Sequence, residues 1–162
     1  MSEKSFEKAK NHLAAYGLDN KIRLFDVSSA TVALAAEALG CAEQLIAKSL
    51  SFAVHDKCVL IVAAGDARVN NSKFKARFGV KASMLPREET ESRLGFAAGG
   101  VCPFGVNEGV EVYLDESLKR FDTVYPAVGT SNSAVELTLS ELELASCSLG
   151  WVDVTKIPED TQ

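Results

Sequence analysis

The sequence has few of the side chains from which metal centres and disulfide networks are built. Its 162 residues include two histidines and four cysteines, and the cysteines are scattered at positions 41, 58, 102 and 147 without a C-x-x-C pair. A structural zinc site needs about four clustered sulfur or imidazole ligands, and a disulfide framework needs closely spaced cysteines. We therefore expect no metal, no cofactor and no disulfide framework, and we expect reduced thiols in a reducing compartment.

Long apolar runs are also missing. No segment approaches the roughly 18 to 20 consecutive apolar residues of a membrane span. Residues 1–5 lead into an amphipathic segment and not into the apolar stretch of a signal peptide. We expect a cytoplasmic protein with no membrane partner.

Positive charge is not in excess. The 17 Lys and Arg residues are outnumbered by 22 Asp and Glu residues, which gives a formal net charge of -5. Coating of a nucleic-acid backbone requires many cations that neutralise phosphates. We therefore expect no DNA partner, and any RNA contact should be local.

The composition is that of one compact domain. Hydrophobic residues make up 47% of the chain, and a chain of this length buries about two-thirds of its unfolded surface. We predict a single domain over residues 1–157 and a loose C-terminal tail over residues 158–162, and we expect a monomer.

Helical and strand periodicities alternate irregularly along the chain. Residues 46–54 and the apolar run 58–64 predict two strands that pair as a hairpin. The pattern Thr138-Leu139-Ser140-Glu141 predicts a capping box at the start of a last helix. Without regular βαβ alternation, the fold class should be α+β, with a mixed, mainly antiparallel, curved and barrel-like sheet surrounded by helices. Other predicted helices cover residues 6–16, 28–40 (capped by Ser28 or Ser29), 71–79 (capped by Asn71 or Ser72) and 86–95, and other strands cover 22–25, 110–114, 124–128 and 134–137.

One lysine lies where strand periodicity predicts an apolar face. Alternation puts Lys48 on the same face as Ile46, Leu50, Phe52 and Val54, and Lys48 is the only polar member. An unpaired ammonium against a core costs several kcal/mol, roughly, or lowers its pKa by up to about 3 to 5 units. Lys48 therefore either reaches water from the end of the strand or has a functional role.

A glycine-rich segment occupies residues 99–105. Glycines on both sides of a proline suit a tight loop whose backbone groups approach a ligand closely. The segment lacks the Gly-Lys-Ser/Thr of a phosphate-binding loop and the spacing of a dinucleotide-binding loop. Two alternatives stay open: a plain turn between a helix and a strand, and a nucleophilic site at Cys102, since a thiolate reacts when a nearby base or cation lowers its pKa.

Two further polar segments follow predicted strands. Residues 129–133 are small and can form hydrogen bonds, so they fit either a polar turn or a loop that faces a ligand. Residues 66–70 combine charge and amide groups after the apolar strand, where an exposed loop is the simpler interpretation. Each segment alone is weak evidence for a site.

Taken together, these segments resemble the YbaK/prolyl-tRNA synthetase-associated domain family, which includes free-standing editing proteins and the insertion domain of bacterial prolyl-tRNA synthetases. The resemblance extends over nearly the whole chain, and it depends on the order and spacing of several modest pieces. These are Thr31-Val32 with residues 36–40, residues 44–50, the turn at 64–69, the loop at 99–105 and the segment 129–136.

The resemblance implies hydrolysis of the ester that joins a wrong amino acid to a tRNA. Lys48 stands at the position of the family's characteristic lysine, which is implied to help place the tRNA end. Backbone groups of the glycine loop are implied to hold the substrate while a ribose hydroxyl positions water, so the protein supplies geometry more than a nucleophile. The implied substrate-binding residues are Thr31, Gly99, Gly100, Val101, Cys102, Pro103, Phe104, Gly105, Ser131 and Asn132.

The implied partners are the acceptor end of an aminoacyl-tRNA and, as a second candidate, an aminoacyl-tRNA synthetase. A synthetase discriminates between similar amino acids only about 10- to 200-fold, so a separate site that hydrolyses the wrong products improves accuracy. Esters of alanine, cysteine, serine and threonine all stay open. Val101, Cys102 and Phe104 are the expected walls of the amino-acid pocket.

Three functions compete. The first is a free-standing deacylase that acts in trans. The second is a non-catalytic module that binds a nucleotide, an aminoacyl-adenylate-like ligand or the aminoacyl-tRNA end. The third is a hydrolase of small esters that uses Cys102 as its nucleophile.

Overall fold

Short helices and strands alternate along the chain in the computed structural model, which describes residues 2–157. The strands are β1 (Ile22–Leu24), β2 (Ile46–Val54), β3 (Lys57–Ala64), β4 (Arg68–Val69), β5 (Glu111–Asp115), β6 (Thr123–Pro126), β7 (Ser133–Val135), β8 (Leu137–Thr138), β9 (Trp151–Val152) and β10 (Thr155–Lys156). The α-helices are α1 (Ser2–Ala14), α2 (Val32–Leu39), α3 (Asn71–Phe78), α4 (Arg87–Leu94) and α5 (Leu139–Ala145). The 3-10 helices are η1 (Asp19–Lys21), η2 (Glu43–Leu45) and η3 (Glu116–Arg120).

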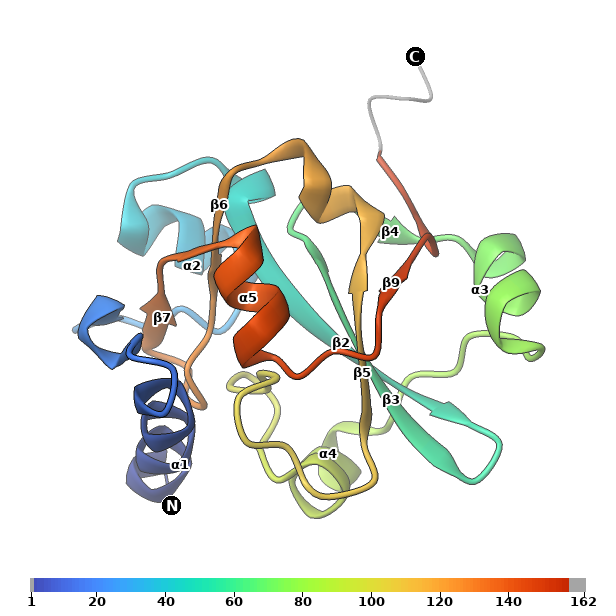
Figure 1. The fold of residues 1–162 in the computed structure, drawn as a ribbon, viewed down its shortest axis with the longest axis horizontal. Coiled ribbons are helices and arrows are strands. Elements are labelled where there is room, and N and C mark those ends of the chain that lie inside the picture. The colour runs from blue at the N-terminus through green and yellow to red at the C-terminus, as the bar shows by residue number, and fades with distance from the viewer. Residues whose placement is uncertain (1, 158–162) are drawn as a thin grey trace.

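The β2–β3 hairpin forms the centre of the molecule. Figure 1 shows it crossing the view diagonally, with α1 near one end of the long axis and α3 at the other. The two strands pair antiparallel from Ala47–Ala64 to Val54–Lys57, as predicted. The turn requires a positive φ of 56° at His55. Seven of the eight residues of β3 are buried, which explains why its apolar run is continuous.

A mixed, curved sheet is built around this hairpin. Its strand order is β8-β6-β2-β3-β5-β9. The β2–β3 and β6–β8 pairs are antiparallel, whereas β6 joins β2, β5 joins β3 and β9 joins β5 in parallel. Two small antiparallel sheets, β1–β7 and β4–β10, lie beside it. The predicted fold class is confirmed, although parallel pairs make a larger share of the main sheet than the sequence suggested.

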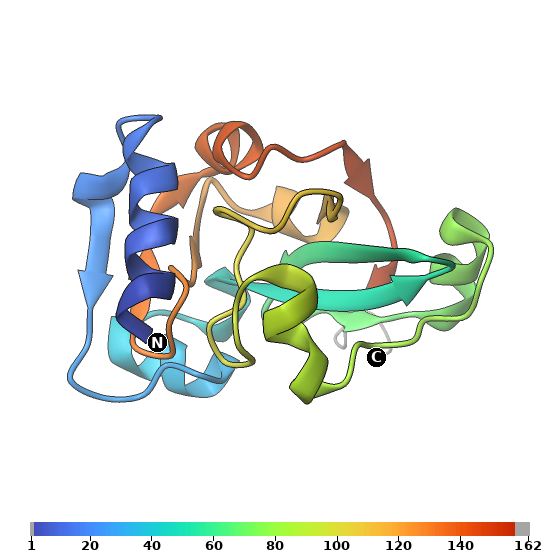
Figure 2. The ribbon, with the colours of Figure 1, turned by 90° about the horizontal axis from the view of Figure 1, so that it is seen from below.

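The two faces of the hairpin contact different helices. Ala47, Val62 and Ala64 belong to a core cluster with residues of α1 and α5, and α4 adds Leu94 to a neighbouring cluster on the same side. On the other side, Phe52 packs against Phe74 of α3, and α2 covers Ile46. Figure 2 shows these helices on both sides of the hairpin.

The helix starts differ from prediction in detail. Thr31 caps α2 by accepting a hydrogen bond from Leu34 N, so Ser28 and Ser29 are not the cap. Asn70 caps α3 one residue earlier than expected. The capping box at Thr138 is present as predicted. A capping side chain needs only a nearby free amide, so adjacent polar residues are hard to rank from sequence.

The strand predicted over residues 134–137 is in fact two strands. β7 pairs with β1, while β8 pairs with β6 in the main sheet. Glu136 lies between them and contacts Arg23 at 2.6 Å. β7 is buried throughout, and Leu137 of β8 is buried as well, so apolar residues continue on both sides of Glu136.

None of the helices within residues 2–157 is long and apolar enough to span a bilayer. The predicted tail, residues 158–162, lies outside the described residues.

Candidate functional site

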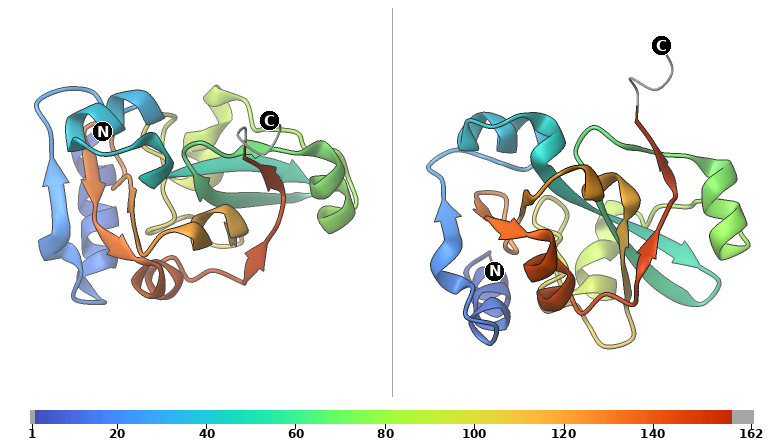
Figure 3. Two further views of the ribbon diagram at one scale, coloured as in Figure 1. Left: turned by 90° about the horizontal axis from the view of Figure 1, so that it is seen from above. Right: turned by 45° about the horizontal axis from the view of Figure 1, so that its top comes forward.

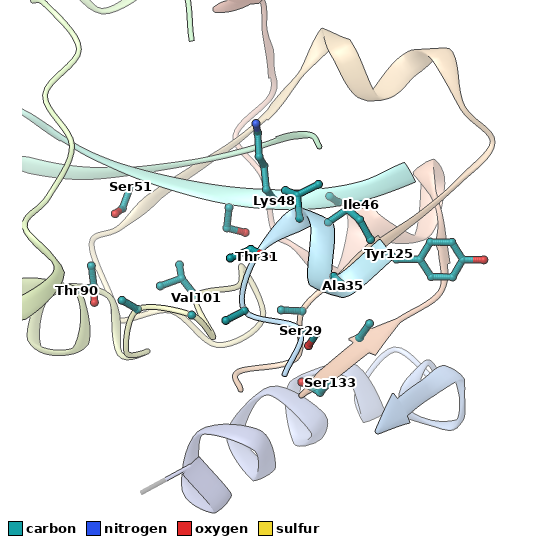
Figure 4. A pocket seen from close by; sticks show the side chains of 18 of the residues that line it. Ser29, Thr31, Ala35, Ile46, Lys48, Ser51, Thr90, Val101, Tyr125 and Ser133 are labelled. Carbon is teal, nitrogen blue, oxygen red and sulfur yellow. The ribbon is translucent and has the colours of Figure 1, made fainter. Parts of the chain in front are cut away.

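A cavity of about 240 Å³ opens beside the first half of β2. Its walls come from α2 with the loop before it, β2, the start of α4, the glycine loop and β6–β7, as Figure 4 shows. The lining residues are Ser29, Ala30, Thr31, Val32, Ala35, Ile46, Ala47, Lys48, Ser49, Ser51, Met84, Leu85, Arg87, Thr90, Ala98, Gly99, Val101, Tyr125, Ala127, Ser133 and Ala134.

An unpaired stretch of the β2 edge borders this cavity. Residues 46–47 pair with β6, and residues 51–53 bond to the segment at 83–85. Ser49 pairs with Val62 of β3 on the inner edge, but no strand of residues 2–157 pairs with it on the outer edge. Because backbone direction alternates along a strand, the N–H and C=O of Ser49 point to the same outer edge as those of residues 51 and 53. The cavity therefore has a backbone donor and acceptor on its β2 side.

Lys48 lines the cavity, but its amine is held by a turn. Nζ donates to the carbonyl oxygens of Ala67 at 2.5 Å and Gly65 at 3.3 Å, just after β3. In Figure 4 the amine points away from Val101 and Ser133. Lys48 is half-buried and does not point freely into solvent. It lies on the expected apolar face of β2, whereas Val101 of the glycine loop packs on the opposite side.

The environment of Lys48 weakens its hold on a proton. Burial lowers the pKa of the Lys48 ammonium, Asp66 raises it, and Arg68 lowers it further. Asp66 also forms a two-pronged ion pair with Arg120, at 2.6 and 3.1 Å. A carboxylate shared with an arginine compensates the lysine only in part, and the carbonyl oxygens of Gly65 and Ala67 supply the rest of its contacts.

Glycine is required at the turn that holds Lys48. A Cβ at Gly65 would overlap the carbonyl oxygen of Glu43 and lie 2.8 Å from Val32 Cγ1. The turn therefore packs directly on α2 and η2. This close contact fixes the carbonyl that receives the Lys48 amine.

Three loops that are distant in sequence meet at the glycine segment. A Cβ on Gly100 would lie 2.6 Å from the carbonyl oxygen of Gly129, and a Cβ on Gly99 would touch Ala30 and Ser131 at 3.7 and 3.8 Å. The structure thus brings the predicted segments at 28–31, 99–101 and 129–133 together. Ser131 lines a second, adjoining cavity of about 130 Å³, together with Gly100.

The second half of the glycine segment lies in the core and not in the cavity. Cys102 and Phe104 are fully buried in the cluster that includes α1, and neither they nor Pro103 and Gly105 line the cavity. The expectation that Cys102 and Phe104 form pocket walls is therefore corrected, whereas Val101 does line the cavity. Burial raises the pKa of the Cys102 thiol to about 12. A thiol with this pKa is almost wholly protonated near pH 7, which argues against a nucleophilic role.

Residues 129–133 form a turn with internal hydrogen bonds. Thr130 Oγ1 lies 2.8 Å from both Asn132 Oδ1 and Ser133 Oγ. Ser133 Oγ also accepts the N–H of Val128 at 3.2 Å. Asn132 lines neither cavity. Its side-chain oxygen accepts a hydrogen bond from Thr130 within the turn.

Sequence reasoning missed several cavity residues. Ser29 Oγ is the one fully buried side-chain polar atom without a hydrogen-bond partner in the described part of the chain, and it lines the cavity. Arg87 and Tyr125 also line it. Arg87 could have been noticed because it ends a stretch that contains no acidic residue; no sequence signal marked Ser29 or Tyr125.

The cavity is cationic although the protein is acidic. Lys48, Arg87 and Tyr125 are the titratable residues among its lining, and no Asp, Glu, His or Cys of the described chain lines it. Clusters of three or more His, Cys, Asp or Glu are also absent from residues 2–157. Two cations next to free backbone groups suit an anionic or ester-bearing ligand.

Comparison with known proteins identifies the family. Residues 27–144 match the aminoacyl-tRNA editing domain, and this match covers most of the chain. The chain belongs to the aminoacyl-tRNA editing domain family. The resemblance predicted from the sequence is thereby confirmed.

Relatives of this editing domain include free-standing and fused proteins. The uncharacterized protein YwhH of Bacillus subtilis (strain 168) is 49% identical over 153 residues, which cover 94% of this chain and 98% of YwhH. The proline--tRNA ligase of the same strain is 36% identical over 73 residues, 44% of this chain but only 13% of the ligase. A crystal structure of a proposed trans-editing enzyme for prolyl tRNA synthetase has a TM-score of 0.84 and 29% identity, covering 94% of this chain and 97% of that one.

Proposed function

We propose that this editing domain hydrolyses the aminoacyl ester of mischarged tRNA and that it acts in trans. The single observation that carries this proposal is the cationic cavity, which lies within the segment that matches the editing family. The described chain corresponds to nearly all of YwhH and to a small part of the proline ligase. The proposal therefore needs no attached synthetase.

The size of the cavity suits the end of a ligand. Pockets that bury a drug-sized molecule have about 300 to 1,000 Å³, and this cavity has about 240 Å³. An aminoacyl group on a terminal ribose can enter, while the rest of the RNA stays outside. The walls include Ala35, Ala47 and Ala134, whose small side chains leave the space from which amino-acid specificity arises.

In the proposed reaction, water attacks the ester carbonyl carbon. The bond to the ribose oxygen breaks, the amino acid leaves as its carboxylic acid, and the ribose oxygen takes a proton. No carboxylate or histidine of the described chain lines the cavity, so the protein contributes position and charge. Arg87 would hold the phosphate and ribose end, Lys48 would add positive charge from the turn at residues 65–67, and backbone groups of Ser49 and Gly99 would orient the ester.

The test compares esters and variants in parallel. Purified tRNA charged with alanine, cysteine, serine or threonine is incubated with wild type, Lys48→Met and Lys10→Met, and the release of free amino acid is measured. Methionine keeps the aliphatic stem but removes the charge. We expect wild type to hydrolyse at least one ester, Lys48→Met to be slower by about 100-fold or more, and Lys10→Met on α1 to match wild type.

Two results would contradict the proposal. The first is full activity of Lys48→Met at an unchanged melting temperature. The second is a wild type that binds a non-hydrolysable aminoacyl-ribose analogue but releases no amino acid from any ester, which would favour the binding module.

A further inference from the structure

Positive charge is concentrated in one stretch of this acidic chain. Residues 68–87, called the basic segment below, hold six of the 17 Lys and Arg residues and none of the 22 Asp and Glu residues. They comprise β4, α3 and the connection to α4. The remainder of the chain is therefore more acidic than the net charge of -5 suggests.

The basic segment begins beside the turn that holds the Lys48 amine and ends at the cavity. Its first residue, Arg68, follows Ala67, whose carbonyl holds the Lys48 amine, and its last residue, Arg87, lines the cavity. In Figure 2, α2, α4 and the chain between α3 and α4 lie in the lower part of the view, and α3 lies at the end away from α1. Both views in Figure 3 keep α3 at the end away from α1 and α2. The chain that carries these cations thus connects α3 with the cavity.

Most of these cations are free to bind a partner. Lys73 is the exception, because it pairs with Asp153 at 3.0 Å. Arg77 stacks its guanidinium 4.8 Å from the ring of Phe78 and 5.1 Å from that of Tyr113, which fixes the side chain without neutralising it. The exposed residues of the segment without a salt bridge inside residues 2–157 are Arg68, Lys75, Arg77, Lys81 and Arg87.

We propose that the basic segment is the surface that binds the acceptor stem of the tRNA whose aminoacyl end enters the cavity. This inference builds on the proposed function. Exposed cations from a segment that has no Asp or Glu of its own can neutralise successive phosphates and release their counterions. The basic segment ends at the cavity, so one tRNA can contact the segment with its stem and the cavity with its aminoacyl end.

An RNA stem fits this surface better than a protein does. Protein interfaces have an apolar core, often with aromatic anchors. Met84 is the one large exposed apolar residue of the basic segment. Its two phenylalanines are not available as anchors, because Phe74 is buried and Phe78 packs against the same cluster. Charge without an apolar centre is typical of contacts to a nucleic-acid backbone.

The test uses two double variants with the same change in charge. Lys75→Glu/Lys81→Glu alters the basic segment, and Lys4→Glu/Lys10→Glu alters α1 at the opposite end of the molecule (Figure 1). Binding of uncharged tRNA is measured over a salt series, and kcat/KM is measured on aminoacyl-tRNA and on an aminoacyl-adenosine ester. We expect the first variant to bind tRNA at least about 10-fold more weakly, with a salt slope reduced by about 1 to 2.

The same variant should hydrolyse aminoacyl-adenosine as wild type does, because that ester has no stem, and the α1 variant should stay within about 3-fold of wild type on both substrates. The inference is overturned if both variants weaken tRNA binding equally, if neither does, or if the basic-segment variant also loses activity on aminoacyl-adenosine. Unchanged tRNA binding would assign the segment to another partner, such as an acidic protein.

Binding and hydrolysis separate this inference from the proposed function. If wild type hydrolyses no ester but the basic-segment variant alone loses tRNA affinity, the deacylase is wrong and the RNA surface is right. If wild type hydrolyses esters and the variant keeps its tRNA affinity, the deacylase is right and the RNA surface is wrong.

Discussion

The hydroxyl of Ser29 is an exception among the buried polar groups of residues 2–157. Buried polar atoms are nearly always hydrogen-bonded, because an unpaired one costs about 1 to 3 kcal/mol. Ser133 shows the ordinary case, since its Oγ accepts the N–H of Val128 and contacts Thr130. Both serines line the cavity. The unpaired group of Ser29 is thus placed where a ligand could satisfy it.

Replacing each serine by alanine should separate these roles. Because its hydroxyl has no partner, Ser29→Ala should leave the free energy of unfolding unchanged or raise it by up to about 1 kcal/mol. Ser133→Ala leaves the amide of Val128 unpaired and should lower the free energy of unfolding by about 1 to 3 kcal/mol. Urea denaturation checks both, and an equal loss in the two variants would show that the Ser29 hydroxyl is bonded after all.

The residues of the site were only partly predictable from sequence. Lys48 stood out because strand alternation puts it on an apolar face, and Phe52 and Val54 of that face do belong to a core cluster. The direction of its amine was not predictable, since it depends on the turn at residues 65–67, which the hairpin brings back beside Lys48. Cys102 looked available in a loop, but core packing decides burial and the sequence does not specify it.

At the scale of elements, α3 connects local chemistry to the proposed RNA surface. Its cap is Asn70, whose side chain accepts the N–H of Lys73 at 3.0 Å. Replacing an Asn cap by alanine lowers the stability of the protein by about 1 kcal/mol. α3 positions Lys75 and Arg77, so its cap supports the surface indirectly.

Two neighbouring asparagines offer a matched test of this cap. Asn70→Ala should lower the free energy of unfolding by about 1 kcal/mol, whereas Asn71→Ala, at the exposed first position of the helix, should change it by less than about 0.5 kcal/mol. Chemical denaturation provides the measurement. A larger loss of stability in Asn71→Ala than in Asn70→Ala would show that Asn71 is the cap, as the sequence pattern predicted.

The elements themselves were largely predictable, and their partners were not. Periodicity located the hairpin and the helices because burial of one face imposes a period of 2 or 3.6 residues. Pairing between distant segments leaves no such local trace. This is why residues 134–137 were predicted as one strand, although β7 and β8 belong to different sheets, and why the parallel contacts of β6 and β5 were underestimated.

At the scale of the whole molecule, the three larger core clusters share the β2–β3 hairpin. Each cluster contains residues of β2, β3 or both, together with helices from distant parts of the chain. No cluster can lose its packing without exposing a face of the same two strands. The hairpin therefore couples α1 and α5 on one side to α3 on the other, as one domain requires.

This coupling predicts that residues 1–157 unfold in a single transition. Differential scanning calorimetry should give one peak whose calorimetric and van't Hoff enthalpies agree, with an enthalpy near 60 °C of about 0.7 kcal/mol per residue. A substitution in one cluster, such as Phe74→Ala beneath α3, should then shift the whole peak to lower temperature because it removes a fully buried ring. If the Phe74→Ala peak instead split, with one part at the wild-type temperature, the two faces of the hairpin would be independent units, and the prediction of a single domain would be wrong.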